Sequence, residues 1–173
     1  MKIVVAITGA SGIELAKKFI QHLEKNIEIH IITSDNAITV NHFEHPNITL
    51  YENSNIAASV ASGSFQVDIT VVIPCSMNSL AKIACGIADN LVTRAAAVAI
   101  KEQKKLLLAP REMPFSAIAL ENMEKLAKLN VIIAPPVMGY YSNSQTKEDI
   151  EMFIVGKWFD VLGLENNLYK RWQ

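Results

Sequence analysis

The sequence predicts an α/β fold, a three-layer sandwich in which a Rossmann- or flavodoxin-like parallel sheet carries helices on both faces. Two observations favour it. Five short apolar runs are nearly continuous, without polar alternation, which is typical of parallel strands buried on both faces. Segments with apolar residues at helical spacing lie between these runs, so strand and helix alternate along the chain. Right-handed crossovers then join the strands.

The predicted strands are rich in β-branched residues and leucine, and turn or loop residues bound each of them. In order, they are Ile3–Ile7, Ile27–Ile32, Ile69–Ile73, Leu106–Ala109 and Val131–Ala134. Apolar stripes predict a helix after the first strand, before the fourth, before the fifth and near the chain end. The four stripes are Ile13, Ala16, Ile20 and Leu23; Ala95, Val98 and Ala99; Ile118, Leu126 and Leu129; and Ile150, Ile154, Trp158, Val161 and Leu162. The polar stretch from Asn41 to Phe65 predicts loops and a short helix.

The length of 173 residues predicts a single domain, residues 1–173, whose last ten residues or so (164–173) form a C-terminal tail. Apolar residues make up 50% and charged residues 19%, which excludes a disordered chain and indicates that something else covers part of its apolar surface. The net charge of −1 gives no sign of a nucleic-acid partner. The apolar runs are too short to cross a membrane, and no N-terminal stretch is typical of a signal peptide. We therefore expect a cytoplasmic protein without a membrane partner.

Ligands of a parallel sheet bind outside the carboxyl ends of its strands. The candidate loops are therefore Thr8–Gly12, Thr33–Asn36, Pro74–Ser79, Pro110–Pro114 and Pro135–Tyr141. The first loop has two interpretations. Its two glycines allow a tight turn close to a ligand, where amides and the Ser11 hydroxyl can bind an anion or a carbonyl. It can equally be a plain strand–helix turn with Ser11 as the cap. It has neither the full dinucleotide fingerprint nor a Walker motif.

The later loops carry further polar side chains. The third loop carries three hydrogen-bonding side chains, Ser76, Asn78 and Ser79. Helix capping needs only one of them, and a polar ring or a ribityl chain would use several. Cys75 is a nucleophile or, more often in such a place, a small buried hydrophobe, and no nearby histidine favours the first.

The pair Arg111–Glu112 stands between two prolines, which favours a functional pair over a weak surface ion pair. A tyrosine pair, Tyr140 and Tyr141, either covers apolar surface or donates to a phosphate. The histidines around Glu44 do not have a zinc spacing, so no metal is expected.

Taken together, the loops resemble the bacterial flavin prenyltransferases, which belong to the homo-oligomeric, flavin-containing decarboxylase-like flavoproteins. The resemblance covers nearly the whole chain and weakens between Asn36 and Ile56. No single motif is unique, but their order and spacing together are specific. The matching motifs are Thr8–Gly12, Ala61–Phe65, Pro74–Ser76, Arg94–Ala96, Ile100–Glu102, Pro110–Phe115, Leu120–Leu126 and Gly139–Tyr141.

The resemblance implies a metal-independent enzyme that alkylates reduced FMN, at N5 and C6, with the dimethylallyl group of dimethylallyl phosphate. The product, prenylated FMN, serves a partner decarboxylase of the ubiquinone or aromatic-acid type. The family also implies a homo-oligomer, usually a dodecamer. Two other functions stay open. Related flavoproteins decarboxylate cysteine compounds, but they carry a catalytic histidine that is not evident here. A non-catalytic flavin carrier would not need the phosphate-binding residues.

The resemblance also implies roles for individual residues. The flavin-contacting positions are Gly9, Ala10, Ser11, Ser34, Ser76, Met77, Asn78, Ser79 and Arg111. The substrate phosphate is held at Lys101, Tyr141 and Lys157, and catalysis is implied for Glu112, Ser11 and Glu44. Trp172 resembles a tryptophan of the family's C-terminal tail. The chain departs from the family pattern in having Leu15 and Ala16 in place of Tyr and Gly, and Lys157 in place of Arg. Lysine keeps the charge but loses the bidentate fork.

Overall fold

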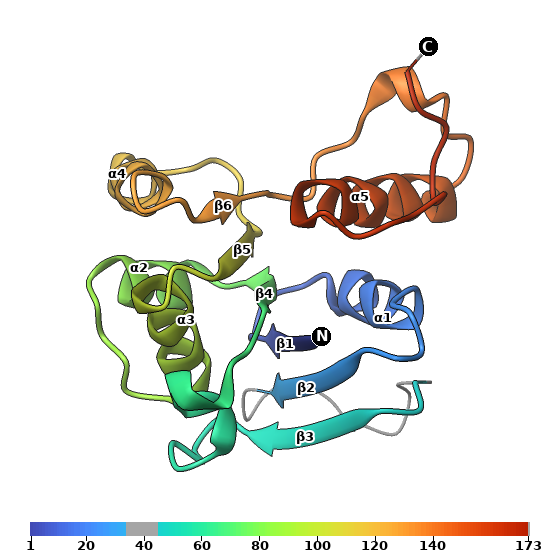
Figure 1. Cartoon of the computed structure of the whole chain (residues 1–173). Helices are drawn as coiled ribbons and strands as arrows, with labels where there is room; N and C mark the ends of the chain where they lie inside the picture. Colours follow the sequence, from blue (N-terminus) through green and yellow to red (C-terminus); the bar gives the residue numbers. More distant parts are fainter. Residues whose placement is uncertain (34–44, 173) are drawn as a thin grey trace.

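The computed structural model describes residues 1–33 and 45–172, and within these residues six strands form one sheet (Figure 1). The strand order is β3-β2-β1-β4-β5-β6, and every neighbouring pair is parallel. The strands are β1 (Lys2–Ile7), β2 (Glu28–Thr33), β3 (Ile48–Glu52), β4 (Ile69–Cys75), β5 (Lys105–Pro110) and β6 (Ile132–Ile133). The predicted fold class is confirmed, and all carboxyl ends of the strands meet at one edge of the sheet.

The continuous apolar runs arise because each central strand supplies two cores. In β1, Ile3, Val5 and Ile7 face one core, while Val4 and Ala6 face the other. The whole of β4 is buried. All five predicted strands are present, and their ends differ from the prediction by at most two residues. Successive side chains of a strand point to opposite faces, so burial of both faces leaves no polar alternation.

The structure has one strand more than predicted, β3. It corrects the prediction of loops for the stretch from Asn41 to Phe65. It lies at the edge of the sheet, where only β2 pairs with it, and Leu50 is 50% exposed. An edge strand needs no continuous apolar run, so its signal was missed. The expected short helix is confirmed by two single turns, η1 (Ser59–Ala61) and η2 (Gly63–Phe65).

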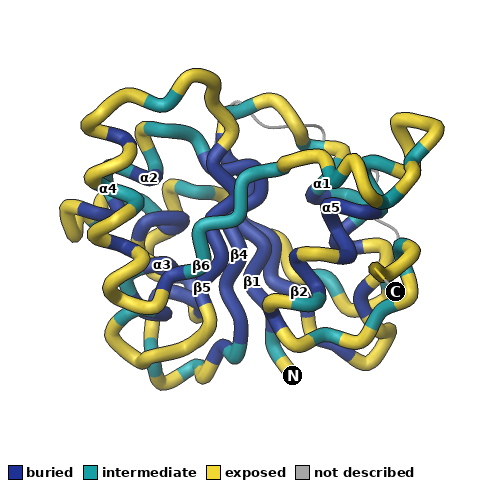
Figure 2. Tube along the Cα trace, turned by 90° about the horizontal axis from the view of Figure 1, so that it is seen from above, coloured by how far each residue is buried: buried dark blue, intermediate teal, exposed yellow. Residues whose placement is uncertain are grey.

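Helices cover both faces of the sheet, as Figures 1 and 2 show. One face carries α1 (Ile13–Gln21) and α5 (Lys147–Leu162), which meet through an edge-to-face contact between Phe19 and Phe159 at 5.0 Å. The other face carries α2 (Met77–Ala84), α3 (Leu91–Lys101) and α4 (Ala117–Ala127). No stripe had predicted α2, which is only eight residues long.

The stripe predicted for α4 is only partly correct. Leu126 is buried, but Ile118 is 72% exposed and Leu129 is 51% exposed. Val161 of the α5 stripe is also exposed. Ile118 and Val161 follow the helical period and yet are exposed in the described part of one chain, and Leu129 lies beyond the end of α4. This agrees with the expectation that part of the apolar surface is covered from outside. No helix in the described part of the chain is long and apolar enough to span a bilayer.

A buried histidine makes the stability of the fold sensitive to pH. The ring of His30 lies between the Tyr51 hydroxyl, 3.1 Å from Nδ1, and the Glu28 carboxylate, 3.0 Å from Nε2, and it meets Phe65 edge to face at 5.0 Å. Burial lowers the pKa of His30 below its ordinary value of 6.5, against the opposing effect of Glu28, and Lys2 adds to the lowering. The folded state therefore binds a proton less readily than the unfolded state.

We expect the His30→Gln variant to lose less stability than the wild type on acidification. The contribution of His30 is fully present above the unfolded pKa and is lost as the pH falls through 6.5 toward the lowered folded value. Thermal midpoints measured between about pH 7 and about pH 5 should therefore fall less steeply in the variant. Substituting the exposed His22 in the same way should leave the wild-type slope, and an equal slope for His30→Gln would contradict the assignment.

Candidate functional site

The chain order reverses between β1 and β4, and the loops that follow these strands are joined at a buried threonine. The Thr8 hydroxyl donates to the Pro74 carbonyl at 2.9 Å and accepts from the Ser76 amide at 2.8 Å. In an open parallel sheet, such a reversal point is where the ligand crevice forms. Thr8 therefore fixes the relative position of the first and third predicted loops. The sequence prediction had not singled out Thr8, whose only signal is a polar residue at the end of an apolar strand.

The first loop is open toward solvent at its glycines. Gly12 is the N-cap of α1 with φ +112°, a conformation that favours glycine, and no side chain of the described residues makes a capping hydrogen bond to the helix. The interpretation of Ser11 as a helix cap is therefore wrong. A Cβ placed on Gly9 would meet no atom within 4 Å, so this part of the backbone has room for a ligand. Ser11 and Gly9 are exposed beside the start of α1.

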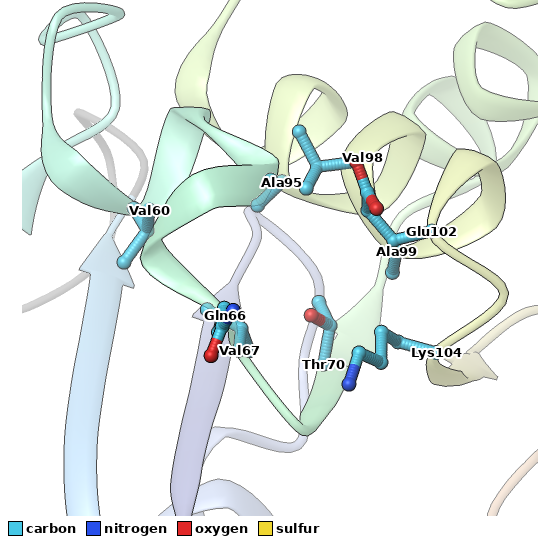
Figure 3. Close-up of a pocket in the computed structure, with 10 residues that line it drawn as sticks. Val60, Gln66, Val67, Thr70, Ala95, Val98, Ala99, Glu102 and Lys104 are labelled. Carbon is cyan, nitrogen blue, oxygen red and sulfur yellow. The ribbon is translucent and has the colours of Figure 1, made fainter.

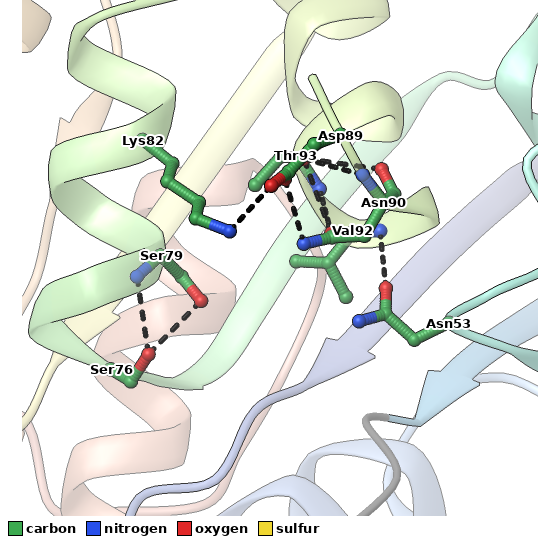
Figure 4. Close-up of polar contacts among 8 residues, drawn as sticks. All are labelled: Asn53, Ser76, Ser79, Lys82, Asp89, Asn90, Val92 and Thr93. Atoms are coloured by element: carbon green, nitrogen blue, oxygen red, sulfur yellow. Dashed lines mark hydrogen bonds and ion pairs between the residues drawn. The ribbon is translucent and has the colours of Figure 1, made fainter. Parts of the chain in front are cut away.

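The third loop opens α2. Ser76 is the N-cap, and its hydroxyl accepts from the Ser79 amide at 3.2 Å and donates to the Ser79 hydroxyl at 3.0 Å (Figure 4). Met77 and Ser79 are half-buried and Asn78 is exposed in the first turn. Cys75 is buried, and burial raises the pKa of its thiol to about 12. A thiol with that pKa stays protonated at neutral pH, so Cys75 is a buried hydrophobe and not a nucleophile.

The fourth loop presents Arg111 and Glu112 as separate groups. The Arg111 amide donates to the Cys75 carbonyl at 3.3 Å, which ties this loop to the third. Glu112 accepts from the Met113 amide at 3.0 Å. Both side chains are exposed, and among the described residues they form no ion pair with each other. The alternative of a surface ion pair is thereby excluded.

Three adjoining hollows follow the fourth and fifth loops. We call them the α4, central and α5 hollows, and their volumes are about 340, 510 and 330 Å³, in the range of small-molecule sites. Glu112 and Pro114 line both the α4 and the central hollow, and Pro135 and Val137 line both the central and the α5 hollow. The α4 hollow is also lined by Met77, Leu80, Ala81, Ser116, Ile118, Ala119 and Asn122, and the central one by Pro110, Arg111, Met113, Phe115 and Pro136.

The α5 hollow combines an apolar wall with two polar groups. Tyr141, in the short helix η3 (Tyr140–Ser142), and Lys157 of α5 both line it, next to Phe153 and Trp158. The indole of Trp158 donates to the Ala134 carbonyl at 3.0 Å, which fixes α5 against the end of β6. Two of the three predicted phosphate-binding residues thus lie in one cavity.

One cavity near the opposite edge of the sheet is much smaller than these hollows. This cavity, between α3 and the segment before β4 and drawn in Figure 3, has a volume of about 10 Å³, space for at most a single water. Thr70, Glu102 and Lys104 are among the residues that line it. This cavity is too small to hold a cofactor or a substrate.

Comparison with known proteins places this geometry in a family. The family model described as "Flavoprotein" matches residues 1–159. The Flavin prenyltransferase UbiX of Helicobacter pylori (strain J99) is 49% identical, with 99% of this chain and 98% of that protein covered. The chain belongs to the flavin prenyltransferase family. Its Methanocaldococcus jannaschii relative of the same name is 41% identical over 99% of this chain and 98% of that protein.

Solved structures of this family superpose closely on the chain. A dodecameric FMN-dependent UbiX-like decarboxylase from Escherichia coli O157:H7 is 41% identical and covers 100% of both chains with a TM-score of 0.91. AnUbiX (PadA1), in complex with FMN and dimethylallyl pyrophosphate, is 36% identical and covers 99% of this chain and 97% of that chain with a TM-score of 0.92. The peptidyl-cysteine decarboxylase EpiD shares 23% identity over 80% of this chain and 82% of its own, with a TM-score of 0.63, and shows the fold alone.

Among the predicted flavin prenyltransferase residues, Lys101 lies apart from the others. Helix α3 starts at the carboxyl edge, where the Leu91 amide donates to the carbonyl of Asn53, the residue that follows β3. It ends at the other edge, where Lys101 pairs with Glu102 beside Gly63. The six residues of β5 separate Lys101 from Arg111 by about 20 Å. Within one subunit, Lys101 therefore does not reach the hollows.

The remaining predicted residues have different outcomes. Ser34 and Glu44 lie outside the described residues. Trp172 meets Tyr141 edge to face at 5.5 Å, so the tail reaches the α5 hollow. At the two positions of α1 where the chain departs from the family pattern, Ala16 is fully buried and Leu15 packs against the same core. This agrees with altered packing of α1 at these positions.

We expect Thr8→Val to weaken flavin binding and lower the thermal stability, while the side chain keeps nearly the same shape. The substitution removes the hydroxyl that links two loops, and it leaves the Ser76 amide and the Pro74 carbonyl without these partners. A lost buried hydrogen-bond partner costs about 1–3 kcal/mol. Flavin titration should show weaker binding and thermal unfolding a lower midpoint. Thr49→Val, the same substitution at an exposed threonine of β3, serves as the control, and unchanged flavin binding in Thr8→Val would contradict the linking role.

Proposed function

We propose that this protein transfers a dimethylallyl group from dimethylallyl phosphate to N5 and C6 of reduced FMN. The product, prenylated FMN, would serve a partner decarboxylase of the ubiquinone or aromatic-acid type. The observation that carries the proposal is the continuous row of hollows at the carboxyl edge, which brings Glu112, Tyr141 and Lys157 to adjoining cavities. The full-length similarity to flavin prenyltransferases supports it. We place the protein in the cytoplasm.

The loops after β1, β4 and β5 fit FMN. Gly9, Ala10 and Ser11 offer backbone amides at an open loop, Ser76 to Ser79 offer side chains at the start of α2, and Arg111 offers a cation. Thr8 holds the first two of these loops together. Bound reduced FMN supplies the nucleophilic atoms of the reaction. The protein's part is to hold the reacting atoms within about 3–3.5 Å of each other.

The α5 hollow suits the prenyl donor. Breaking the allylic C–O bond builds negative charge on the phosphate, which the Lys157 ammonium and the Tyr141 hydroxyl are placed to stabilise. Positive charge builds on the allyl group, and the aromatic side chains of Phe153 and Trp158, which line the hollow, would stabilise it while the apolar wall excludes water. Glu112, between the other two hollows, is placed to carry a proton to or from the departing phosphate, and Ser11 to assist beside the flavin.

The position of Lys101 supports a homo-oligomeric enzyme. Since Lys101 lies at the far edge of its own subunit, we propose that a neighbouring subunit supplies it to each site. Exposed apolar side chains such as Ile118 and Val137 would be covered in the same assembly. We propose a dodecamer, as in the Escherichia coli relative.

Anaerobic incubation with reduced FMN and dimethylallyl phosphate tests the function. The expected product is a flavin heavier by one prenyl unit in the mass spectrum. Unmodified FMN together with turnover of a cysteine peptide would identify a cysteine decarboxylase instead. Bound FMN with neither activity would identify a carrier. Replacing the phosphate donor with dimethylallyl diphosphate in a parallel reaction shows which donor is preferred.

A further inference from the structure

The C-terminal tail, described by the structure for residues 164–172, folds back on α5 and is held at a single carboxylate. Asp160 accepts hydrogen bonds from Asn166 at 2.9 Å, from both terminal nitrogens of Arg171 at 2.9 and 3.2 Å, and from the Tyr169 hydroxyl. We call these four residues the latch. Asp160 is mostly shielded from solvent, and carboxylates accept such charge-assisted hydrogen bonds strongly.

Ionisation keeps the latch closed near neutral pH. Burial raises the pKa of Asp160, but hydrogen bonds from Tyr169, Arg171 and Asn166 outweigh it and leave the pKa below its ordinary value. Burial and the hydrogen bond to Asp160 raise the pKa of Tyr169 to about 12. The carboxylate thus stays charged while the phenol keeps the proton that it donates.

A glycine on α5 makes room for the latch. A Cβ added at Gly156 would lie 2.9 Å from Cε1 of Tyr169 and 3.2 Å from Oδ1 of Asn166. The Asn166 side chain also donates to the Gly156 carbonyl at 3.4 Å. Glycine is a poor residue for a helix interior, so its presence one turn before Asp160 is explained by the close approach of the tail.

Aromatic contacts connect the latch to the α5 hollow. Tyr169 meets Phe153 edge to face at 5.1 Å, and Trp172 meets Tyr141 in the same way at 5.5 Å. Tyr141 and Phe153 touch each other at 5.5 Å, and both line the hollow. The tail is therefore the outer layer of the aromatic wall.

We propose that Asp160 is a positioning residue, which holds the tail so that Tyr169 and Trp172 fix Phe153 and Tyr141 around the prenyl donor. This role rests on the proposed function, because it assigns the donor to the α5 hollow. Asp160 does not line that hollow and acts through the tail. Opening the latch populates a form in which the α5 hollow binds the donor weakly, whereas saturating donor still selects the closed form. It should therefore raise KM for dimethylallyl phosphate and leave kcat nearly unchanged.

Limited trypsin digestion with intact-mass detection tests the latch without any ligand. Cleavage after Lys170 or Arg171 removes the end of the tail. Both residues are exposed, but the closed latch holds this segment in a fixed conformation, and an open latch frees it to enter the protease site. We expect cleavage in Asp160→Ala at least about tenfold faster than in the wild type. Gly156→Ala should show the same change, because it displaces Tyr169 while improving the helix propensity of α5. Glu165→Gln, an exposed tail carboxylate, should behave as the wild type. Equal cleavage rates in wild type and Asp160→Ala would overturn the latch.

Steady-state kinetics of the same variants test whether the latch positions the donor. We expect KM for dimethylallyl phosphate to rise by about tenfold in Asp160→Ala and Gly156→Ala, with kcat within about twofold of the wild type. Faster cleavage with an unchanged KM would overturn the positioning role. If the wild type makes no prenylated flavin, the proposed function fails. The cleavage rates still test the latch in that case, because they do not depend on any ligand. The dissociation constant of dimethylallyl phosphate from the FMN-loaded protein, measured by calorimetry, then replaces KM.

Discussion

Glu112→Gln is expected to slow prenyl transfer by about two to four orders of magnitude while FMN still binds. Glutamine keeps the oxygen that accepts from the Met113 amide, so the loop retains its conformation, but it cannot exchange a proton with the phosphate. Single-turnover formation of the heavier flavin, measured at saturating donor, gives the rate. A flavin titration of the same variant shows whether binding is intact.

The control for Glu112→Gln is a carboxylate outside the hollows. Glu121 is exposed on α4, and Glu121→Gln removes the same charge without touching the proposed site. Its rate should equal that of the wild type. A wild-type rate in Glu112→Gln itself would remove Glu112 from the catalytic residues. Catalysis would then rest on electrostatic stabilisation of the leaving phosphate by the other groups.

Mixing two inactive variants should restore activity. Lys101→Ala removes a cation from the phosphate site and is expected to lower kcat about 100-fold or more. In oligomers assembled from equal amounts of Lys101→Ala and Glu112→Gln subunits, some sites receive Glu112 from one subunit and Lys101 from its neighbour. Random assembly makes about a quarter of the sites intact, so about a quarter of the wild-type activity should return.

The matched control replaces the Glu112→Gln partner with the double variant Lys101→Ala/Glu112→Gln. No site in that mixture has both residues, so no activity should return. Absence of recovery in the first mixture as well would show that Lys101 does not act across subunits. The physical basis of the expectation is the direction of α3, which carries Lys101 to the edge of the sheet opposite Glu112.

Local patterns were sufficient to predict the fold class. The strands β1, β2, β4, β5 and β6 supply apolar side chains to both cores, and this property is visible in each run of residues without knowledge of its neighbours. The edge strand β3 was missed because only one neighbour pairs with it and none of its five residues is buried, so it has no continuous apolar run. Ile118 shows the converse, since it follows a genuine helical period and yet is 72% exposed within one subunit.

The candidate loops could likewise be predicted, because a parallel sheet brings all carboxyl strand ends to one edge. Tertiary structure alone decided which side chains meet there. It joined Thr8 to Ser76 across 68 residues, excluded Ser11 as a helix cap, and buried the thiol of Cys75.

Short-range patterns therefore specify the parallel sheet, five of its strands and the loops that form the site, since hydrophobic periodicity and turn residues act over short segments. The packing of distant segments brings Tyr141 and Lys157 into one hollow, keeps Lys101 out of it within one chain, and fastens the tail at Asp160. These facts depend on the direction in which each helix crosses the sheet and on contacts between distant segments, and no local pattern encodes them.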